Sequence, residues 1–180
     1  MVKLFLGTLM FVGMAKQCSK VDLYFRLDQN AHPAILVKID SVIRYDQSAA
    51  DSAQRSWAAE FSAEFNSSFI QYHPDKKTIH KLRRRISGVS IKVVGGNWCS
   101  DTRRELPKLC KVLYYSGLSA DSLEYYRVDR DKKAIYPDFA TGWTKAPIPD
   151  IAIYRNGKVI GHIFEVTRKS MEEDLLKILK

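Results

Sequence analysis

Apolar residues change their spacing around residue 96, and this change marks the best-defined element of the chain. An apolar run at residues 91–94 ends at Gly95-Gly96, and Trp98-Cys99 follows two residues later. After this point apolar residues recur at i, i+3, i+4 and i+7, which is the spacing of one helix face. They are Leu106, Leu109, Cys110 and Leu113. The pattern predicts a strand, a glycine turn, an exposed cysteine and then an amphipathic helix.

Helical spacing also occurs in two earlier segments. Aromatic residues recur at every fourth position, which predicts a helix over 48–69 with its aromatic stripe in a core. They are Trp57, Phe61, Phe65 and Phe69. A second helix is predicted over 75–87, with a strongly basic face that we interpret as solvated; attraction of an acidic partner is the alternative. Residues 21–45 fit both strand and helix spacing, and we leave them open.

The C-terminal part of the chain alternates strands and helices. The predicted elements are strands at 123–128, 151–154 and 159–164, a short helix and loop at 132–141, and a helix from 170 onward. Asn156-Gly157 predicts a β-hairpin, and Ser170 with Glu173 forms a capping box. Strands that alternate with helices pair in parallel, whereas the hairpin adds antiparallel strands. The sequence therefore predicts an α/β fold, with a central mixed β-sheet flanked by helices on both faces.

Composition and charge exclude only a few classes of function. The 180 residues favour one domain with extensions, and a hydrophobic content of 46% suits a packed core. The formal net charge of +9 could attract nucleic acid or another polyanion, but no nucleic-acid-binding motif accompanies it. We therefore expect no nucleic-acid partner and interpret the charge as a solubility feature, with binding through the basic helix as the weakest alternative.

The cysteines suggest reactivity rather than a scaffold. Three cysteines are too few for a disulfide framework, and none lies in a cluster with zinc-ligand spacing, so we expect no metal and no cofactor. Cys99 and Cys110 would lie about 16 Å apart along one helix, too far for a disulfide. Cys110 is predicted to be a core residue. Cys99 is predicted at a helix N-terminus, where free N–H groups favour a thiolate.

The N-terminus resembles a signal peptide. Lys3 precedes a short apolar run that ends near Ala15, which is too short for a comfortable membrane-spanning helix. We expect residues 1–17 to be removed, no integral membrane span in the mature chain, and a periplasmic or secreted protein. Cys18 leaves a lipoprotein open, and a buried N-terminal segment of a cytoplasmic protein is the other alternative. An oxidising compartment would suit thiol–disulfide chemistry.

The central motif resembles the active site of thioredoxin. Residues 98–102, Trp-Cys-Ser-Asp-Thr, are similar to its Trp-Cys-x-x-Cys turn, with threonine in place of the second cysteine. Pro107 matches the proline of its active-site helix, 148–150 its cis-proline loop, and 151–160 its next hairpin. The similarity covers roughly residues 75–180. It is closest to thioredoxin-like proteins with a Trp-Cys-x-Asp-Ser/Thr-Arg-Arg-Glu motif, common in Bacteroidetes.

The resemblance implies a thioredoxin-like domain at 75–180 that follows a mainly helical N-terminal extension at 18–74. It also implies a thiol–disulfide oxidoreductase whose nucleophile is Cys99 and whose substrate is a protein or low-molecular-weight disulfide. Thr102 cannot resolve a mixed disulfide, so an external reductant such as a glutathione-like thiol must do so. Reductase, isomerase and mixed-disulfide chemistry all fit. The alternative is a non-catalytic module that binds an extended peptide beside Pro149.

Other site residues follow from the same resemblance. Pro149 is expected to be cis, and the backbone of Ile148 is expected to hydrogen-bond an extended substrate. Trp98 would pack beside the thiol and contribute to substrate binding. Arg103 either forms a surface ion pair with neighbouring charges or recognises a substrate carboxylate such as that of glutathione.

Three positions depart from the thioredoxin pattern. Val93 stands where the family keeps a buried aspartate, so no proton acceptor is evident there. Asp150 follows the proline, and a carboxylate near the thiol would disfavour the thiolate and repel acidic substrates. Thr102 is expected either to donate a hydrogen bond to the Cys99 thiolate or to cap the helix.

Overall fold

The structure, a computed structural model, describes residues 52–131 and 147–180. The predicted signal peptide at 1–17, the ambiguous segment at 21–45 and the short helix predicted at 132–141 lie outside the described residues.

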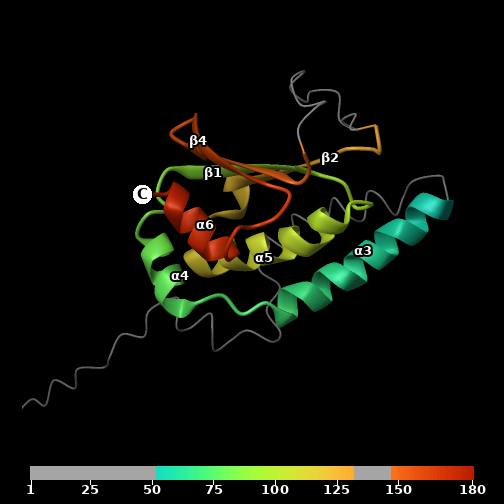
Figure 1. Ribbon diagram of the computed structural model, residues 1–180, viewed down its shortest axis with the longest axis horizontal. Coiled ribbons are helices and arrows are strands. Elements are labelled where there is room, and N and C mark those ends of the chain that lie inside the picture. The colour runs from blue at the N-terminus through green and yellow to red at the C-terminus, as the bar shows by residue number, and fades with distance from the viewer. Residues whose placement is uncertain (1–51, 132–146) are drawn as a thin grey trace, which may run out of the picture.

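The described residues form an α/β fold around one four-stranded mixed sheet (Figure 1). Its strands are β1 (Val89–Gly95), β2 (Leu123–Arg127), β3 (Asp150–Arg155) and β4 (Lys158–Phe164). Their order across the sheet is β2-β1-β3-β4. The central strand β1 pairs in parallel with β2 and antiparallel with β3, which pairs antiparallel with β4. The predicted mixed sheet and its hairpin are therefore confirmed.

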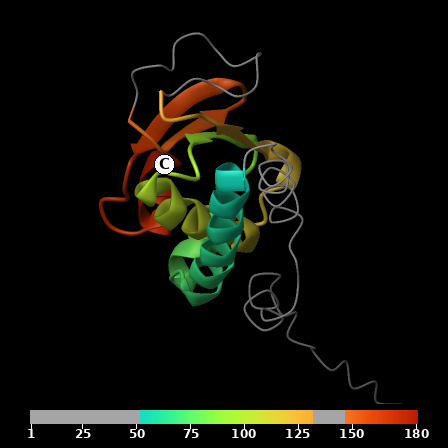
Figure 2. The same ribbon diagram turned by 90° about the vertical axis from the view of Figure 1, so that its right-hand side faces the viewer.

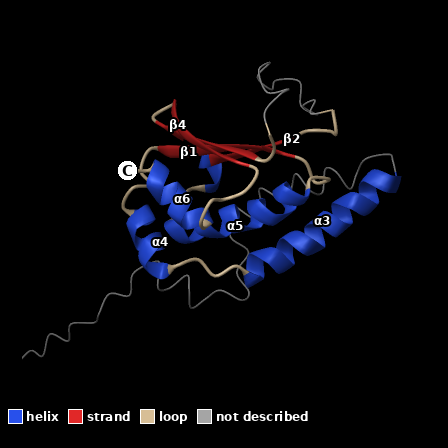
Figure 3. Ribbon diagram, viewed as in Figure 1, coloured by secondary structure: helices blue, strands red, loops and turns tan. Residues whose placement is uncertain are grey.

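The helices of the described residues gather on one side of this sheet (Figures 1 and 3). They are α3 (Ser52–Gln71), α4 (Lys76–Arg83), α5 (Ser100–Ser116), α6 (Met171–Ile178) and the 3₁₀ helix η1 (Ala120–Ser122). The turned view gives the same arrangement (Figure 2). Helices were predicted on both faces, but the described part of the chain places none on the second face. None of these helices is both long and apolar enough to cross a bilayer.

Local sequence signals explain where the helices begin and end. Asp75 accepts a hydrogen bond from Thr78 N at the start of α4. Ser170 accepts one from Glu173 N at the start of α6, as the capping box predicts. Helix α5 ends at Gly117, whose φ of 78° lets its N–H reach back to two carbonyls of the last turn.

Helix α3 packs into the same core as the sheet. Its aromatic residues were predicted to form a core stripe. Phe61 and Phe65 are at most 3% exposed, and Phe69 is 7% exposed. One cluster joins these side chains to residues of β1, β3, α5 and α6, including Ile91, Val93, Leu106, Leu109, Ile151 and Leu175. The segment assigned from sequence to an extension therefore shares the core of the domain from at least Phe61 onward.

Two buried charged side chains, Lys111 of α5 and Glu172 of α6, hold the end of α3 and the segment after it by hydrogen bonds. The Lys111 ammonium is almost fully buried, donates to the Ile70 carbonyl at 3.1 Å and lies over the Phe69 ring. The carboxylate of Glu172 accepts from Tyr72 Oη at 2.5 Å, and from the Asp75 amide. Burial, reinforced by this hydrogen bond and by the charge of Glu172, raises the pKa of Tyr72 above its ordinary value.

Shortening a core side chain of α3 tests whether this helix belongs to the domain. Phe65→Ala is expected to lower the free energy of unfolding by about 3–5 kcal/mol, because Phe65 is 3% exposed and its loss leaves a cavity. Ile70→Ala on the same helix, at 62% exposure, is expected to change it by less than about 0.5 kcal/mol. Urea unfolding followed by circular dichroism measures both. A Phe65→Ala chain that loses α3 in a separate, earlier transition would contradict a shared core.

Candidate functional site

Cys99 lies where the central strand passes into a helix. Strand β1 ends at Gly95, and the Cys99 amide donates to the Gly96 carbonyl at 2.9 Å, which closes a tight turn. Cys99 is the N-cap residue of α5, and its own carbonyl accepts from Arg103 N at 3.0 Å. Its side chain is partly exposed and forms no disulfide. The predicted order of strand, glycine turn, cysteine and helix is confirmed, with the cysteine partly rather than fully exposed.

Trp98 packs against this turn at Gly96. Its Nε1 donates to the Val128 carbonyl at 3.0 Å, at the end of β2. A Cβ on Gly96 would lie 2.5 Å from the same nitrogen, so a glycine is needed for the indole to reach this position. The Arg130 guanidinium lies 5.4 Å from the centre of the Trp98 ring and brings a positive charge that the sequence analysis missed.

The proline loop meets the cysteine. The Ile148–Pro149 peptide bond is cis, as predicted. Cys99 Sγ donates to the Ile148 carbonyl at 3.6 Å, and both residues pack around Val94 and Val128. Two segments 49 residues apart in the sequence thus form one site. The backbone of Ile148 was predicted to bind the substrate, and in the structure its carbonyl accepts a hydrogen bond from the thiol.

Thr102 stabilises the turn rather than the sulfur. It is fully buried, and its hydroxyl accepts from Gly96 N at 3.4 Å. A Cβ on Gly95 would lie 2.8 Å from the Thr102 methyl group. The structure gives Thr102 neither the hydrogen bond to Cys99 nor the helix-capping bond that the sequence analysis expected. Its contacts hold the first turn of α5 against the end of β1.

Charged residues on the first turns of α5 already have protein partners. The Arg103 guanidinium forms a partly buried ion pair with Glu64 of α3. Of the two roles predicted for Arg103, an ion pair or recognition of a substrate carboxylate, the structure shows the ion pair. Glu105 on the same helix is 1% exposed, and its carboxylate pairs with Arg104 and Lys108.

A buried aspartate and a histidine form a pair beside the proline loop. Asp150 is 2% exposed, and its Oδ1 lies 2.8 Å from His162 Nδ1 on the neighbouring strand β4. The His162 ring stacks on Phe164, with ring centres 5.1 Å apart. Burial raises the pKa of Asp150, and His162 opposes that rise. The sequence predicted the carboxylate beside the proline but not the histidine that pairs with it.

The remaining cysteine of the described residues is not a second reactive group. Cys110 lies on the buried face of α5 as predicted, and burial raises the pKa of its thiol far above the ordinary value. Within residues 52–131 and 147–180, no three His, Cys, Asp or Glu side chains gather in a way that could hold a metal ion.

Comparisons with known proteins do not assign the chain to a family. No family model matches the sequence, and no curated protein matches it significantly. A crystal structure of a protein of unknown function from Pseudomonas aeruginosa is similar, with 13% sequence identity and a TM-score of 0.46. The match covers 76% of this chain and 89% of that one. At this level the likeness supports neither a fold family nor a function.

The raised pKa of Asp150 predicts a pH-dependent stability. The folded state keeps its proton at pH values where the unfolded chain, with an ordinary pKa of 3.8, has lost it. The free energy of unfolding of the wild type therefore falls as the pH rises through this window. Asp150→Asn removes that titration, so the variant should gain stability relative to the wild type as the pH rises from 3.8 to the pKa of folded Asp150.

Urea unfolding at a series of pH values measures this difference. Asp121→Asn, at an exposed position of η1, is the matched control and should show no such pH trend. A difference between Asp150→Asn and the wild type that stays constant with pH would contradict the raised pKa.

Proposed function

We propose that this protein is a thiol–disulfide oxidoreductase of the thioredoxin-like class that acts through the single nucleophile Cys99. The observation that carries the proposal is the position of its sulfur. The thiol is partly exposed, stands at the N-cap of α5 and lies 3.6 Å from the carbonyl of the proline loop. A helix N-terminus favours negative charge, and thiolate is the form of cysteine that attacks disulfides.

The reaction proceeds in three exchange steps. The Cys99 thiolate attacks one sulfur of a substrate disulfide, a new S–S bond forms, and the other substrate sulfur leaves as a thiolate that takes up a proton. An external thiolate then attacks the mixed disulfide at the Cys99 sulfur or at the substrate sulfur. When attack on the substrate sulfur frees Cys99, the substrate remains joined to the external thiol. A second external thiol completes the reduction, with two external thiols oxidised to one disulfide.

The need for an external thiol follows from the groups around Cys99. Thr102, in the position of a resolving cysteine, is buried against the glycine turn and has no sulfur. Cys110 is fully buried and lies further along the same helix. Neither can attack a disulfide on Cys99, so a low-molecular-weight thiol such as glutathione is the resolving group that we propose.

The surroundings of the thiol suit a disulfide at the end of an extended chain. The Trp98 indole and the buried Ile148 side chain provide apolar surface in the same cluster as Cys99. The Arg130 guanidinium adds a positive charge above Trp98. We further propose that the protein works in an oxidising compartment, to which the signal-peptide-like residues 1–17 would direct it.

Adduct formation with oxidised glutathione tests the proposal. In a Cys18→Ser background, the reduced protein is expected to gain one glutathione, seen by intact mass and located on Cys99 by peptide mapping. Adding Cys99→Ser should abolish the adduct, whereas adding Cys110→Ala should leave it. Reduced glutathione should then release it, because the external thiol resolves the mixed disulfide.

Two outcomes would count against the enzyme. One is an adduct that forms on Cys99 no faster than on an unstructured cysteine peptide at the same pH. The other is a partner protein, captured by the wild type, that the Cys99→Ser variant retains equally well, as expected for a peptide-binding module without catalysis.

A further inference from the structure

A basic groove lies between α4 and α6. It is a depression of about 760 Å³ that contains the following basic residues: Lys81, Arg85, Arg168, Lys169, Lys177 and Lys180. Two carboxylates, Glu173 and Asp174, also line it. We call these eight residues and the space between them the cationic groove.

The basic side chains of the cationic groove are available to a ligand. All six are exposed, and none forms an ion pair with a carboxylate in the described part of the chain. They come from α4 and the turn after it, from the loop before α6, and from α6 and the residue at the C-terminus. One of the two carboxylates has a structural partner, since Asp174 Oδ2 accepts from the Arg168 amide at 2.6 Å. Six positive charges therefore converge on a space with two negative ones.

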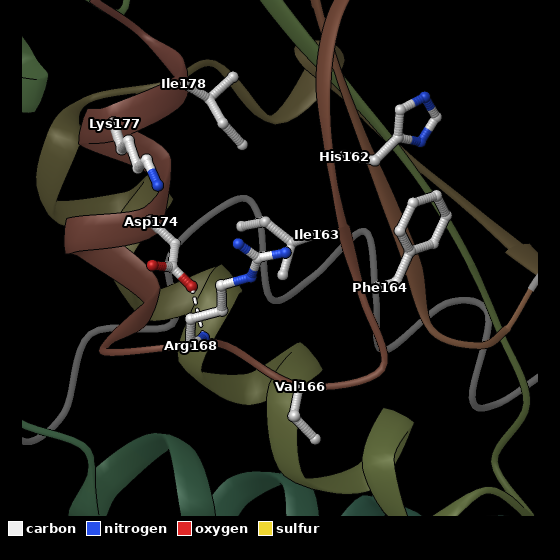
Figure 4. A pocket seen from close by; sticks show the side chains of 8 residues that line it. All are labelled: His162, Ile163, Phe164, Val166, Arg168, Asp174, Lys177 and Ile178. Carbon is white, nitrogen blue, oxygen red and sulfur yellow. Dashed lines mark hydrogen bonds between the residues drawn. The ribbon is translucent and has the colours of Figure 1, made fainter.

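The cationic groove continues into a smaller depression next to the sheet. This second space, of about 350 Å³, shares Arg168, Asp174 and Lys177 with the first and extends to β4 (Figure 4). Figure 4 shows the Arg168 guanidinium in the space between α6 and the strand, with Lys177 along α6 and the Arg168–Asp174 hydrogen bond below. The hydrogen bond fixes the backbone from which Arg168 projects.

We propose that the cationic groove binds a compact polyanion that carries two or more phosphate groups. A surplus of four positive charges matches such a ligand better than a single carboxylate, and Arg and Lys are the usual phosphate-binding side chains. No aromatic side chain lines the larger depression, so it lacks the stacking platform on which single-stranded nucleic acids depend. Its volume is that of a small-molecule site.

This site is independent of the thiol chemistry. Thr78 and Leu176, which also line the groove, belong to α4 and α6, and neither these residues nor the basic ones contact Cys99 or Pro149 in any described interaction. Phosphate binding and disulfide exchange can therefore be tested separately, and failure of one leaves the other standing.

Calorimetric titration of the full chain with inorganic tripolyphosphate tests the proposal. We expect saturable binding to the wild type that weakens between about 50 and 200 mM salt, because charge neutralisation releases counterions. The groove variant Lys81→Ala/Arg168→Ala/Lys177→Ala should lose more than about tenfold in affinity. The control variant Lys77→Ala/Arg84→Ala/Lys158→Ala removes the same total charge from exposed positions outside both depressions and should lose less than about threefold.

The variants change only exposed side chains, and their thermal unfolding verifies that they fold. Amide chemical-shift changes in the wild type provide a second measurement without any variant, and should centre on 78–85 and 168–180. Equal losses in both triple variants would overturn the proposal, because they would mean diffuse attraction to a basic protein. Binding to phosphatidylglycerol vesicles that requires the groove, without any binding of tripolyphosphate, would overturn it too and assign the site to a lipid surface.

Discussion

The close contact between the first turn of α5 and the backbone of Gly95 and Gly96 determines the geometry of the proposed active site. Thr102 occupies the space that a side chain on Gly95 would need, and Trp98 occupies the space beside Gly96. Because both side chains press against bare backbone, the helix begins directly at the end of the central strand. Cys99 consequently stands at the N-cap with its sulfur turned toward the proline loop. The two glycines make this close approach of the helix to the end of the strand possible, because a side chain at either position would clash with Thr102 or Trp98.

Much of the fold follows from local chemistry that the sequence displays openly. The Asn156-Gly157 turn, the Ser170 cap and the aromatic spacing of α3 each depend on residues close in sequence, and each element forms where it was predicted. The meeting of Cys99 with the Ile148–Pro149 bond was predicted only through a family resemblance. Neither residue carries a local signal of the other, because the contact joins segments 49 residues apart.

The Asp150–His162 pair illustrates what the sequence could not supply. The two-residue turn pairs Arg155 with Lys158, and continuing that register would set Asp150 opposite Ile163. An irregularity between Ile153 and Tyr154 shifts the pairing by one residue, so that Asp150 faces Phe164 and its carboxylate reaches His162 on the same side of the sheet. A shift of one residue exchanges the faces of a strand. Nothing in the hydrophobic pattern of β4 reveals that shift.

The ion pair between Arg103 and Glu64 has a consequence for how the two parts of the chain depend on each other. It joins the opening turn of the cysteine-bearing helix to a helix that ends before the segment resembling thioredoxin begins. Glu64 thus sets the charge that Arg103 presents around residue 99, although it contributes nothing to the motif itself. A shorter chain that started at residue 75 would keep every residue of the motif but would lack Glu64. Arg103 would then face solvent without its carboxylate partner. The charge distribution around the site therefore depends in part on a residue outside the motif.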